Sequence, residues 1–394
     1  MPGPLHGYRV IDATQMISGP VATMILGDQG ADVIKVEPPG GGDLVRQLGA
    51  VRGGMAPTFV TSNRNKRSIV LDLKSARGLA LLERLVAGAH AFVQNFRPGK
   101  AEAMGIGEEA LRRIRPDLVY VSISGFGETG PYADKRVYDP IIQALSGLAD
   151  IQADHTTGRP RMVRVIVPDK LTAVTAAQGI TAALLARERT GQGQHVRLSM
   201  LDATISFLWP EGMSAHTFLA DRERVAGPSL SQDLIFETAD GFITAGAVSD
   251  DEWEGLTRAV DHPEWLDDER FRTAAGRIAH VEDRLRLLAE VLRTRSSAEW
   301  LERFDAAQVP CAPVLRREDL PDHPQVRANE LIVESVHPHA GPMREARPAV
   351  RFDHTPADIR RPAPALGEHT DEILAELGCE PSEIAALRET RVVA

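Results

Sequence analysis

Hydrophobic residues in the first third of the chain fall into short runs separated by segments with helical periodicity. The runs Tyr8–Ala13 and Ala31–Glu37 are apolar and β-branched, as is typical of buried strands, and Pro20 between them suits the first turn of a helix. The alternation continues, with strand-like runs over Arg67–Leu73, His90–Phe96 and Leu118–Gly125 and helical patterns over Gly78–Ala87 and Glu108–Ile114. This order predicts a doubly wound α/β domain with right-handed crossovers.

The rest of the chain has a different pattern. Pro168–Arg189 is rich in Ala and Leu and precedes a Thr-Gly-Gln-Gly sequence, so we expect a long, largely buried helix that ends at these glycines. A strand-like run over Phe236–Ala247 followed by charged helical stretches predicts a smaller α+β domain over residues 225–315. Proline-rich joints then lead to a tail with another helix over Asp371–Leu377.

Composition narrows the class of protein. The 394 residues are 43% hydrophobic and carry a formal charge of −10, which suits a globular protein and argues against nucleic-acid binding. Cys311 and Cys379 are too few and too far apart for a disulfide framework or a zinc knuckle, and the histidines are scattered, so no metal site is expected. The N-terminus lacks a signal-peptide pattern, and no segment approaches the roughly 18 apolar residues of a membrane span. We therefore expect a cytoplasmic protein without a membrane partner.

Two glycine-rich segments are candidate ligand sites, and the surrounding sequence supports only the first of them. Residues 40–43 form a triple-glycine loop that ends in Asp43 directly after the second strand-like run, which places a ligand site near residue 40. Residues 125–130 match the G-x-G-x-x-G dinucleotide fingerprint, but Pro131 and Tyr132 follow where that fingerprint requires a helix start. NAD and flavin are therefore not expected as cofactors.

Candidate chemical groups lie near predicted strand and helix ends. Asp169 lies at the start of the long helix, where amide donors and the helix dipole favour its ionised form; it is either a helix cap or a nucleophile. The segment Asn95–Gly99 follows a predicted strand at the end where α/β proteins bind ligands, whereas Arg64–Arg67 enters its strand from the other side. Together these basic and amide side chains favour a polyanionic small ligand.

With these residues in view, the chain resembles the class III CoA-transferase family, which includes formyl-CoA transferase and crotonobetainyl/carnitine CoA-transferases. The similarity extends over nearly the whole length and rests on several blocks in one order: GPVATMILGDQGADVIKVEPPGGGD, NRNKRSIVLDL, VQNFRPG, GFGETGPY, YDPIIQALSGL, RERTGQGQHVRLSMLDA and LGEHTDEILAELG. Several such blocks together are far more specific than a single motif.

The resemblance implies that Asp169 is the catalytic nucleophile, acylated by an acyl-CoA and then converted to an aspartyl-CoA thioester that passes CoA to a carboxylic acid. CoA is then a substrate, and no metal, NAD or flavin takes part. The implied CoA contacts are Met16, Ile17 and Ser18 at the nucleotide, Leu71, Lys74, Asn95, Phe96 and Arg97 around its pocket, and Arg136, Tyr138 and Met200 nearer the pantetheine and the reactive end.

The chain departs from the family at several positions. Pro168 replaces a glycine that often precedes the nucleophile, and Ile17 replaces the glutamine of formyl-CoA transferase; Pro38 and Ala103 stand where that enzyme has arginines. Its glycine-rich loop has no match around Gly246. We therefore do not expect oxalate or formate as substrates, and the apolar residues Ile17, Val167 and Leu171 favour a larger or less polar acyl group.

The family's fold implies a large Rossmann-like domain built from both chain ends and a smaller domain from the middle. The expected division is a CoA-binding part over 1–200, a linker over 201–224, the small α+β domain over 225–315, a linker over 316–340, and a return to the large domain over 341–394. The resemblance also implies a homodimer of interlocked ring-like subunits.

Two other functions remain open. One is an isomerase similar to α-methylacyl-CoA racemase, although Tyr138 stands before Asp139 where the racemases tend to have a histidine base. The other is a CoA-binding protein without turnover.

Overall fold

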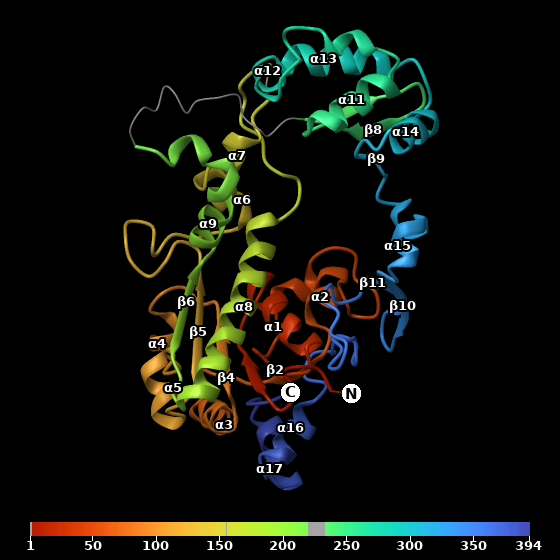
Figure 1. The fold of residues 1–394 in the computed structure, drawn as a ribbon. Coiled ribbons are helices and arrows are strands. Elements are labelled where there is room, and N and C mark those ends of the chain that lie inside the picture. The colour runs from red at the N-terminus through yellow and green to blue at the C-terminus, as the bar shows by residue number, and fades with distance from the viewer. Residues whose placement is uncertain (1, 155, 220–232) are drawn as a thin grey trace. The chain divides into compact units, whose positions relative to one another are not determined.

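The computed structural model describes residues 2–154, 156–219 and 233–394 and divides the chain into two compact units (Figure 1). The first unit contains Met1–Trp209 and Ala328–Ala394, and the second contains Pro210–Arg327. Both ends of the chain therefore belong to one unit. The domain boundary that we expected between residues 224 and 225 lies outside the described residues.

The first unit is built on a parallel sheet of six strands in the order β3-β2-β1-β4-β5-β6. The strands are β1 Arg9–Asp12, β2 Asp32–Glu37, β3 Lys66–Val70, β4 Ala91–Gln94, β5 Val119–Ser124 and β6 His195–Ser199. The chain runs outward from β1 to β3 and then returns to the other side of β1 at β4. The strand order thus reverses between β1 and β4, which is where open α/β sheets form a crevice for ligands.

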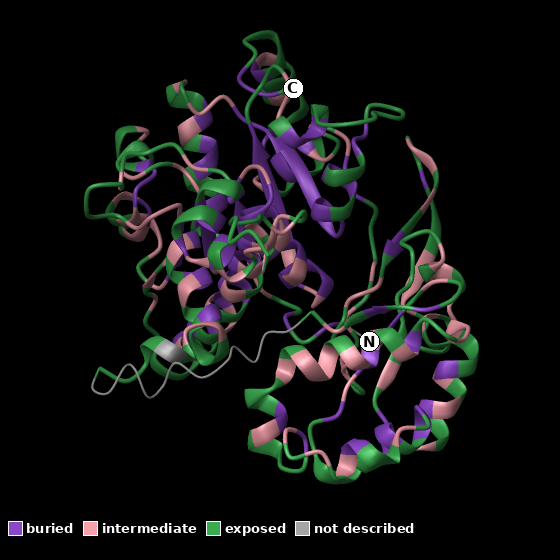
Figure 2. Cartoon of the chain, turned by 90° about the horizontal axis from the view of Figure 1, so that it is seen from above, coloured by how far each residue is buried: buried purple, intermediate pink, exposed green. Residues whose placement is uncertain are grey.

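Helices cover both faces of this sheet and confirm the α/β prediction. One face packs against α1 Ser18–Asp28 and α8 Val167–Thr190, through an apolar cluster that includes Leu26, Val121 and Ile180. The other packs against α3 Ala76–Ala87, α5 Glu108–Ile114 and the C-terminal helices α16 Thr370–Glu376 and α17 Pro381–Glu389. Figure 2 shows the strands between these layers as largely buried.

Shorter helices and a separate hairpin complete the first unit. The helices are α2 Pro57–Asn63, α4 Lys100–Ala103, α6 Asp139–Leu145, α7 Leu148–Ile151 and α9 Met200–Gly212, of which residues 210–212 fall in the second unit, and the hairpin consists of β10 Ile332–His337 and β11 Gly341–Ala346. Residues 201–212, which we expected to belong to a linker, lie in α9. The edge strand β6 was not predicted, because its sequence HVRLS mixes charged and apolar residues, as a partly exposed edge allows.

The second unit packs helices on a small antiparallel sheet in the order β7-β8-β9. The run that we expected to be one strand, Phe236–Ala247, is a hairpin with β7 Ile235–Glu237 and β8 Phe242–Ala245, because Thr238 and Gly241 close a turn between them. The other elements are β9 Cys311–Pro313, α11 Asp250–Ala259, α12 Ala274–Ala279, α13 Val281–Leu292 and α14 Ser297–Ala306, with α15 Pro324–Ala328 at the end of the unit. Trp253, Trp265 and Trp300 lie in its core.

The described residues contain neither a helix that could span a membrane nor a cluster of metal ligands. Within 2–154, 156–219 and 233–394, no helix is both long and apolar enough to cross a bilayer. The same residues contain no group of three or more His, Cys, Asp or Glu side chains that could hold a metal ion.

Candidate active site

The topology brings most of the expected CoA contacts to the carboxyl edge of the sheet. Met16, Ile17 and Ser18 follow β1, Leu71 and Lys74 follow β3, Asn95, Phe96 and Arg97 follow β4, and Met200 follows β6. At the reversal of strand order, Asn95 accepts a hydrogen bond from the Gln15 backbone N–H at 2.9 Å and donates to the Gln15 carbonyl at 2.7 Å. These two bonds join the loops after β1 and β4 at the predicted ligand crevice.

Asp169 lies in the first turn of α8, as the sequence predicts. Its backbone N–H donates to Asp139 Oδ2 at 3.1 Å, and its carboxylate accepts hydrogen bonds from the hydroxyl and the backbone N–H of Ser18. Ser18 is the first residue of α1, which packs against α8. The half-buried Asp169 carboxylate therefore lies where the N-termini of two helices meet, next to the loop that follows β1.

The surroundings of Asp169 change its basicity. Burial and the nearby Asp139 carboxylate raise the pKa of Asp169 to about 6, against the opposing effect of the Ser18 hydrogen bonds. Asp169 is thus mainly ionised at neutral pH and more basic than an exposed aspartate. A group of this kind combines the charge and the basicity that a carboxylate nucleophile needs.

Asp139 and Gln143 support this arrangement, and our sequence analysis did not select them as site residues. Both are buried, and Gln143 Nε2 donates to Asp139 Oδ1 at 2.6 Å while Gln143 Oε1 accepts from the Val163 backbone N–H at 3.0 Å. The pair therefore links α6 to the segment that leads into α8. The available signal was the i, i+4 spacing of an acid and an amide in DPIIQ, which places them on one helix face.

Tyr138 and Arg136, which we expected near the pantetheine and the reactive end, are both exposed. Tyr138 is the residue before α6 with a side chain 63% exposed, and Arg136 is also exposed. Asp139, the next residue, contacts the backbone of Asp169 instead.

A buried ion pair between Lys66 and Asp12 supports the end of the loop after β1, where α1 begins. Lys66 Nζ lies 2.8 Å from Asp12 Oδ2 and donates to the Pro20 carbonyl and to Asn63 Oδ1, each also at 2.8 Å. The side chains of Lys66 and Asp12 have no exposed area. Although burial alone would raise it, the Lys66 and Lys35 charges hold the pKa of Asp12 below its usual range.

A second buried pair, Lys35 and Asp43, acts on the same loop. Their charged atoms are 3.0 Å apart, Lys35 donates to the Thr14 carbonyl at 2.9 Å, and Asp43 accepts from the Met16 backbone N–H at 3.1 Å. Met16 has a φ of +69°, which is rare for a residue with a side chain. Strain of this kind persists only where the surroundings impose it, and it is common at functional sites.

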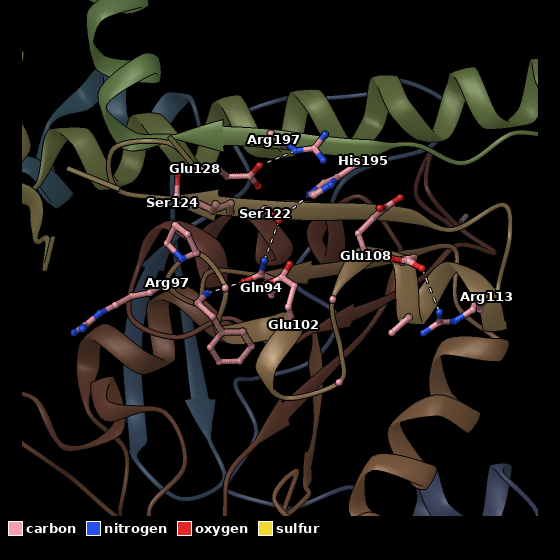
Figure 3. A pocket seen from close by; sticks show the side chains of 18 residues that line it. Gln94, Arg97, Glu102, Glu108, Arg113, Ser122, Ser124, Glu128, His195 and Arg197 are labelled. Carbon is pink, nitrogen blue, oxygen red and sulfur yellow. Dashed lines mark hydrogen bonds and ion pairs between the residues drawn. The ribbon is translucent and has the colours of Figure 1, made fainter. Parts of the chain in front are cut away.

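Two cavities open near these loops. A cavity of about 170 Å3 is lined by Leu71, Lys74 and Phe96 together with Pro38 and Pro39, next to the triple-glycine loop where we expected a ligand. A larger cavity of about 520 Å3 is also lined by Phe96, and Figure 3 shows the side chains around it.

The larger cavity contains a chain of polar side chains across neighbouring strands (Figure 3). Gln94 accepts from the Phe96 backbone N–H at 2.7 Å and donates to Ser122 Oγ at 2.9 Å, and Ser122 Oγ lies 2.8 Å from His195 Nε2. Arg97 also lines this cavity. This row of hydrogen-bonded side chains fixes the start of the loop after β4, which carries several expected CoA contacts.

The other basic residues noted in the sequence hold the fold together. Arg64 pairs with Asp28 at 2.8 Å and with Glu345 at 2.8 Å, and Arg67 pairs with Asp32 and with Glu376 of the C-terminal helix α16. These contacts lie at the amino end of β3, as expected from the position of Arg64–Arg67 in the sequence. They join the two ends of the chain and are remote from the carboxyl edge.

Comparisons with known proteins find relatives that match this chain over nearly its whole length. The model of CoA-transferase family III matches residues 5–370. Human succinyl-CoA:glutarate CoA-transferase is 34% identical over 379 residues, which cover 95% of this chain and 86% of the relative. Formyl-CoA:oxalate CoA-transferase of Shigella sonnei is 33% identical over 426 residues, with all of both chains covered.

A solved structure shows the same fold over nearly its whole length. A CAIB/BAIF family protein from Brucella suis superposes with a TM-score of 0.82 at 30% identity, covering 96% of this chain and 100% of the other. The match of the family model over most of the chain, and relatives similar from end to end, confirm the resemblance seen in the sequence. The chain belongs to the class III CoA-transferase family.

Proposed function

We propose that this protein transfers CoA from an acyl-CoA to a carboxylic acid, with Asp169 as the nucleophile. The observation that supports this proposal most directly is the position of Asp169, half-buried at the first turn of α8 and hydrogen-bonded by Ser18, with its pKa raised to about 6. Its neighbours are loops at the ligand-binding edge of a parallel sheet.

The proposed reaction moves CoA from one acyl group to another through successive attacks at carbonyl carbons, without net proton transfer. The Asp169 carboxylate attacks the thioester carbonyl, the C–S bond breaks, and a mixed anhydride and CoA thiolate form. The thiolate then attacks the Asp169 carbonyl and expels the donor acid, leaving an aspartyl-CoA thioester. An acceptor carboxylate attacks this thioester and releases the thiolate, which then takes the new acyl group and frees Asp169.

The two helix N-termini beside Asp169 suit the charges that develop in these steps. Each tetrahedral intermediate carries a negative oxygen, and the helix dipoles at the starts of α1 and α8 favour negative charge there. The buried ion pairs beside the loop after β1 keep the start of α1 in position, which reduces the reorganisation needed during the reaction.

The acid substrates are proposed by chemical class. Relatives named for succinyl-CoA, glutarate, formyl-CoA and oxalate indicate small carboxylic acids as candidates. The apolar residues Ile17, Val167 and Leu171 lie around the start of α8 or of α1, so we expect a donor larger than formyl-CoA. A panel that compares formyl-CoA, succinyl-CoA and longer acyl-CoA donors tests this expectation.

We also propose a homodimer. Large apolar side chains are exposed on neighbouring helices: Ile141 and Leu145 on α6, Val174 and Leu185 on α8, and Phe207 and Trp209 on α9. A soluble monomer rarely exposes so many, and a second copy of the chain would cover them. Light scattering should give twice the chain mass, and Phe207→Glu should weaken the association. A stable folded monomer in the unmodified protein would contradict the proposal.

The interlocked arrangement of subunits has its own test. If the rings are linked, subunits cannot exchange between dimers without unfolding. When isotopically labelled dimers are mixed with unlabelled dimers, native mass spectrometry should therefore detect no hybrid dimer until denaturant is added. Rapid exchange in buffer would show separable subunits.

The central experiment follows the covalent intermediate. The protein is incubated with acyl-CoA, treated with hydroxylamine, and digested for mass spectrometry. We expect a modified Asp169, and we expect Asp169→Ala to bind CoA but to lack both adduct and exchange. Asp150→Ala, which changes an exposed aspartate of α7, is the matched control and should behave as wild type. Unchanged turnover in Asp169→Ala would refute the assignment.

The adduct experiment and a second assay in deuterated water separate the two alternatives. A racemase would incorporate deuterium from solvent at the carbon beside the thioester, without a need for acceptor acid. A CoA-binding protein without turnover would show neither deuterium nor adduct across the whole panel of thioesters.

A further inference from the structure

Gln143, in the second turn of α6, is a buried amide that the proposed CoA-transfer steps do not use. Its Oε1 accepts a hydrogen bond from the Val163 backbone N–H at 3.0 Å, and its Nε2 lies 3.3 Å from the Val163 carbonyl oxygen and 3.4 Å from that of Val165. Because a backbone N–H can only donate and a carbonyl oxygen can only accept, these contacts fix the orientation of the amide. Nε2 is thereby directed toward Asp139.

The shortest contact of Gln143 holds the Asp139 carboxylate. Gln143 Nε2 donates to Asp139 Oδ1 at 2.6 Å, and the Asp169 backbone N–H donates to Asp139 Oδ2 at 3.1 Å. Both oxygens of Asp139 therefore act as acceptors, as those of an ionised carboxylate do. Asp139 is 2% exposed, so these donors, rather than solvent, set the direction of its side chain.

Asp139 acts in turn on the nucleophile of the proposed function. Burial and the Asp139 charge raise the pKa of Asp169 to about 6, whereas the hydrogen bonds from Ser18 oppose this rise. Helices α6 and α1 pack against α8, and Asp139 and Ser18 are the groups through which they act on Asp169. A side chain that keeps Asp139 in place therefore influences Asp169 without touching it.

We propose that Gln143 is a positioning residue for the nucleophile: it holds the Asp139 carboxylate against the first turn of α8, so that a negative charge stays beside Asp169. This inference rests on the proposed role of Asp169 in CoA transfer. It concerns the reactivity of Asp169 rather than CoA binding, because Gln143 is buried whereas the expected CoA contacts nearest in sequence, Arg136 and Tyr138, are exposed.

The protonation of Asp169 is measurable without turnover. Infrared difference spectra between each protein and its Asp169→Asn counterpart isolate the carboxylic acid band of Asp169, and the growth of this band with falling pH gives a midpoint. Gln143→Leu cannot donate to Asp139, which then takes up a proton or turns away, so the midpoint should fall by about one pH unit. Gln152→Leu, at an exposed position after α7, is the matched control and should titrate as wild type. Equal midpoints in these two variants would overturn the proposal.

A second variant, Gln143→Glu, separates positioning from a general loss of structure. Glutamate keeps an acceptor for the Val163 backbone N–H and shares one proton with Asp139, so the pair retains a single negative charge. The midpoint of Asp169 should therefore stay close to that of wild type. A midpoint as low as that of Gln143→Leu would mean that the charge of Asp139 is not what Gln143 maintains, and the proposal would fail.

CoA exchange supplies the other readout. In Gln143→Leu, kcat should fall about tenfold while KM for the acyl-CoA is unchanged, and the acid limb of kcat/KM should move to lower pH. An equal loss of kcat/KM at every pH would indicate a structural effect alone and would contradict the positioning role. If wild type shows neither exchange nor an adduct on Asp169, the proposed function fails, whereas the infrared midpoints still decide whether Gln143 acts on Asp169.

Discussion

The buried pair of Lys66 and Asp12 allows a quantitative prediction for Lys66→Met. Methionine nearly matches lysine in length but removes a charge with three partners at 2.8 Å, all in an interior without solvent. Asp12 keeps its hydrogen bonds from Thr14 and Thr23 but loses its ion pair. Loss of one partner of a buried pair costs about 3 to 5 kcal/mol. At about 2 °C for each kcal/mol in a unit of this size, the melting temperature should fall by about 6 to 10 °C.

Differential scanning fluorimetry of purified variants measures this shift. Lys100→Met makes the same substitution at an exposed position of α4 and should change stability by less than about 0.5 kcal/mol. Adding Asp12→Asn to Lys66→Met removes the unpaired charge and should restore part of the loss, as a coupled pair requires. The reasoning is refuted if Lys66→Met melts within about 1 °C of Lys100→Met.

Three further predictions concern other parts of the molecule. In the proposed reaction the attacking form of Asp169 is the carboxylate, so kcat/KM should fall as the pH drops through about 6. Ser18→Ala removes the hydroxyl hydrogen bond that lowers the pKa of Asp169, so the decline should begin at higher pH, and a coincident profile would contradict this. Arg67→Met should release α16, lower stability by about 1 to 3 kcal/mol and expose the C-terminus to limited proteolysis, unlike wild type. Burial and Asp305 raise the pKa of Cys311 to about 11. Asp305→Asn should therefore speed the alkylation of Cys311 by iodoacetamide at about pH 8, as measured by mass spectrometry, and an unchanged rate would argue against the role of Asp305.

Local patterns predicted strands β1 to β5 of the first unit well because these strands are buried on both faces. The runs around β1, β2, β4 and β5 are continuous apolar sequences, and the helix over Pro168–Arg189 corresponds to α8 Val167–Thr190. The pattern was weaker where burial is partial. It missed β6 at the edge of the sheet, merged β7 and β8 into one strand, and treated the start of α9 as a linker.

The candidate site likewise has one part that the sequence could predict and another that depends on packing. Asp169 could be selected from its position at a helix start and from the resemblance to a family, but the same pattern fits a plain helix cap. Asp169 contacts Ser18, which is more than 100 positions away in sequence, and Asp139, which is 30 positions away. Only packing of α1 and α6 against α8 brings these residues together. The pKa of Asp169 follows from those contacts, so no local pattern could have indicated it.

The sequence by itself determined the α/β class and the family and offered Asp169 as a candidate nucleophile, because these depend on periodicity and on ordered motifs along the chain. Tertiary structure decided which charged residues serve the fold and which serve the site. Lys35 lies in a predicted strand and Lys66 in the basic run Arg64–Arg67, and the structure buries both fully, where they hold the segment that carries Ser18. The reason is physical: burial and electrostatic coupling depend on distances between segments that meet only after the chain has folded.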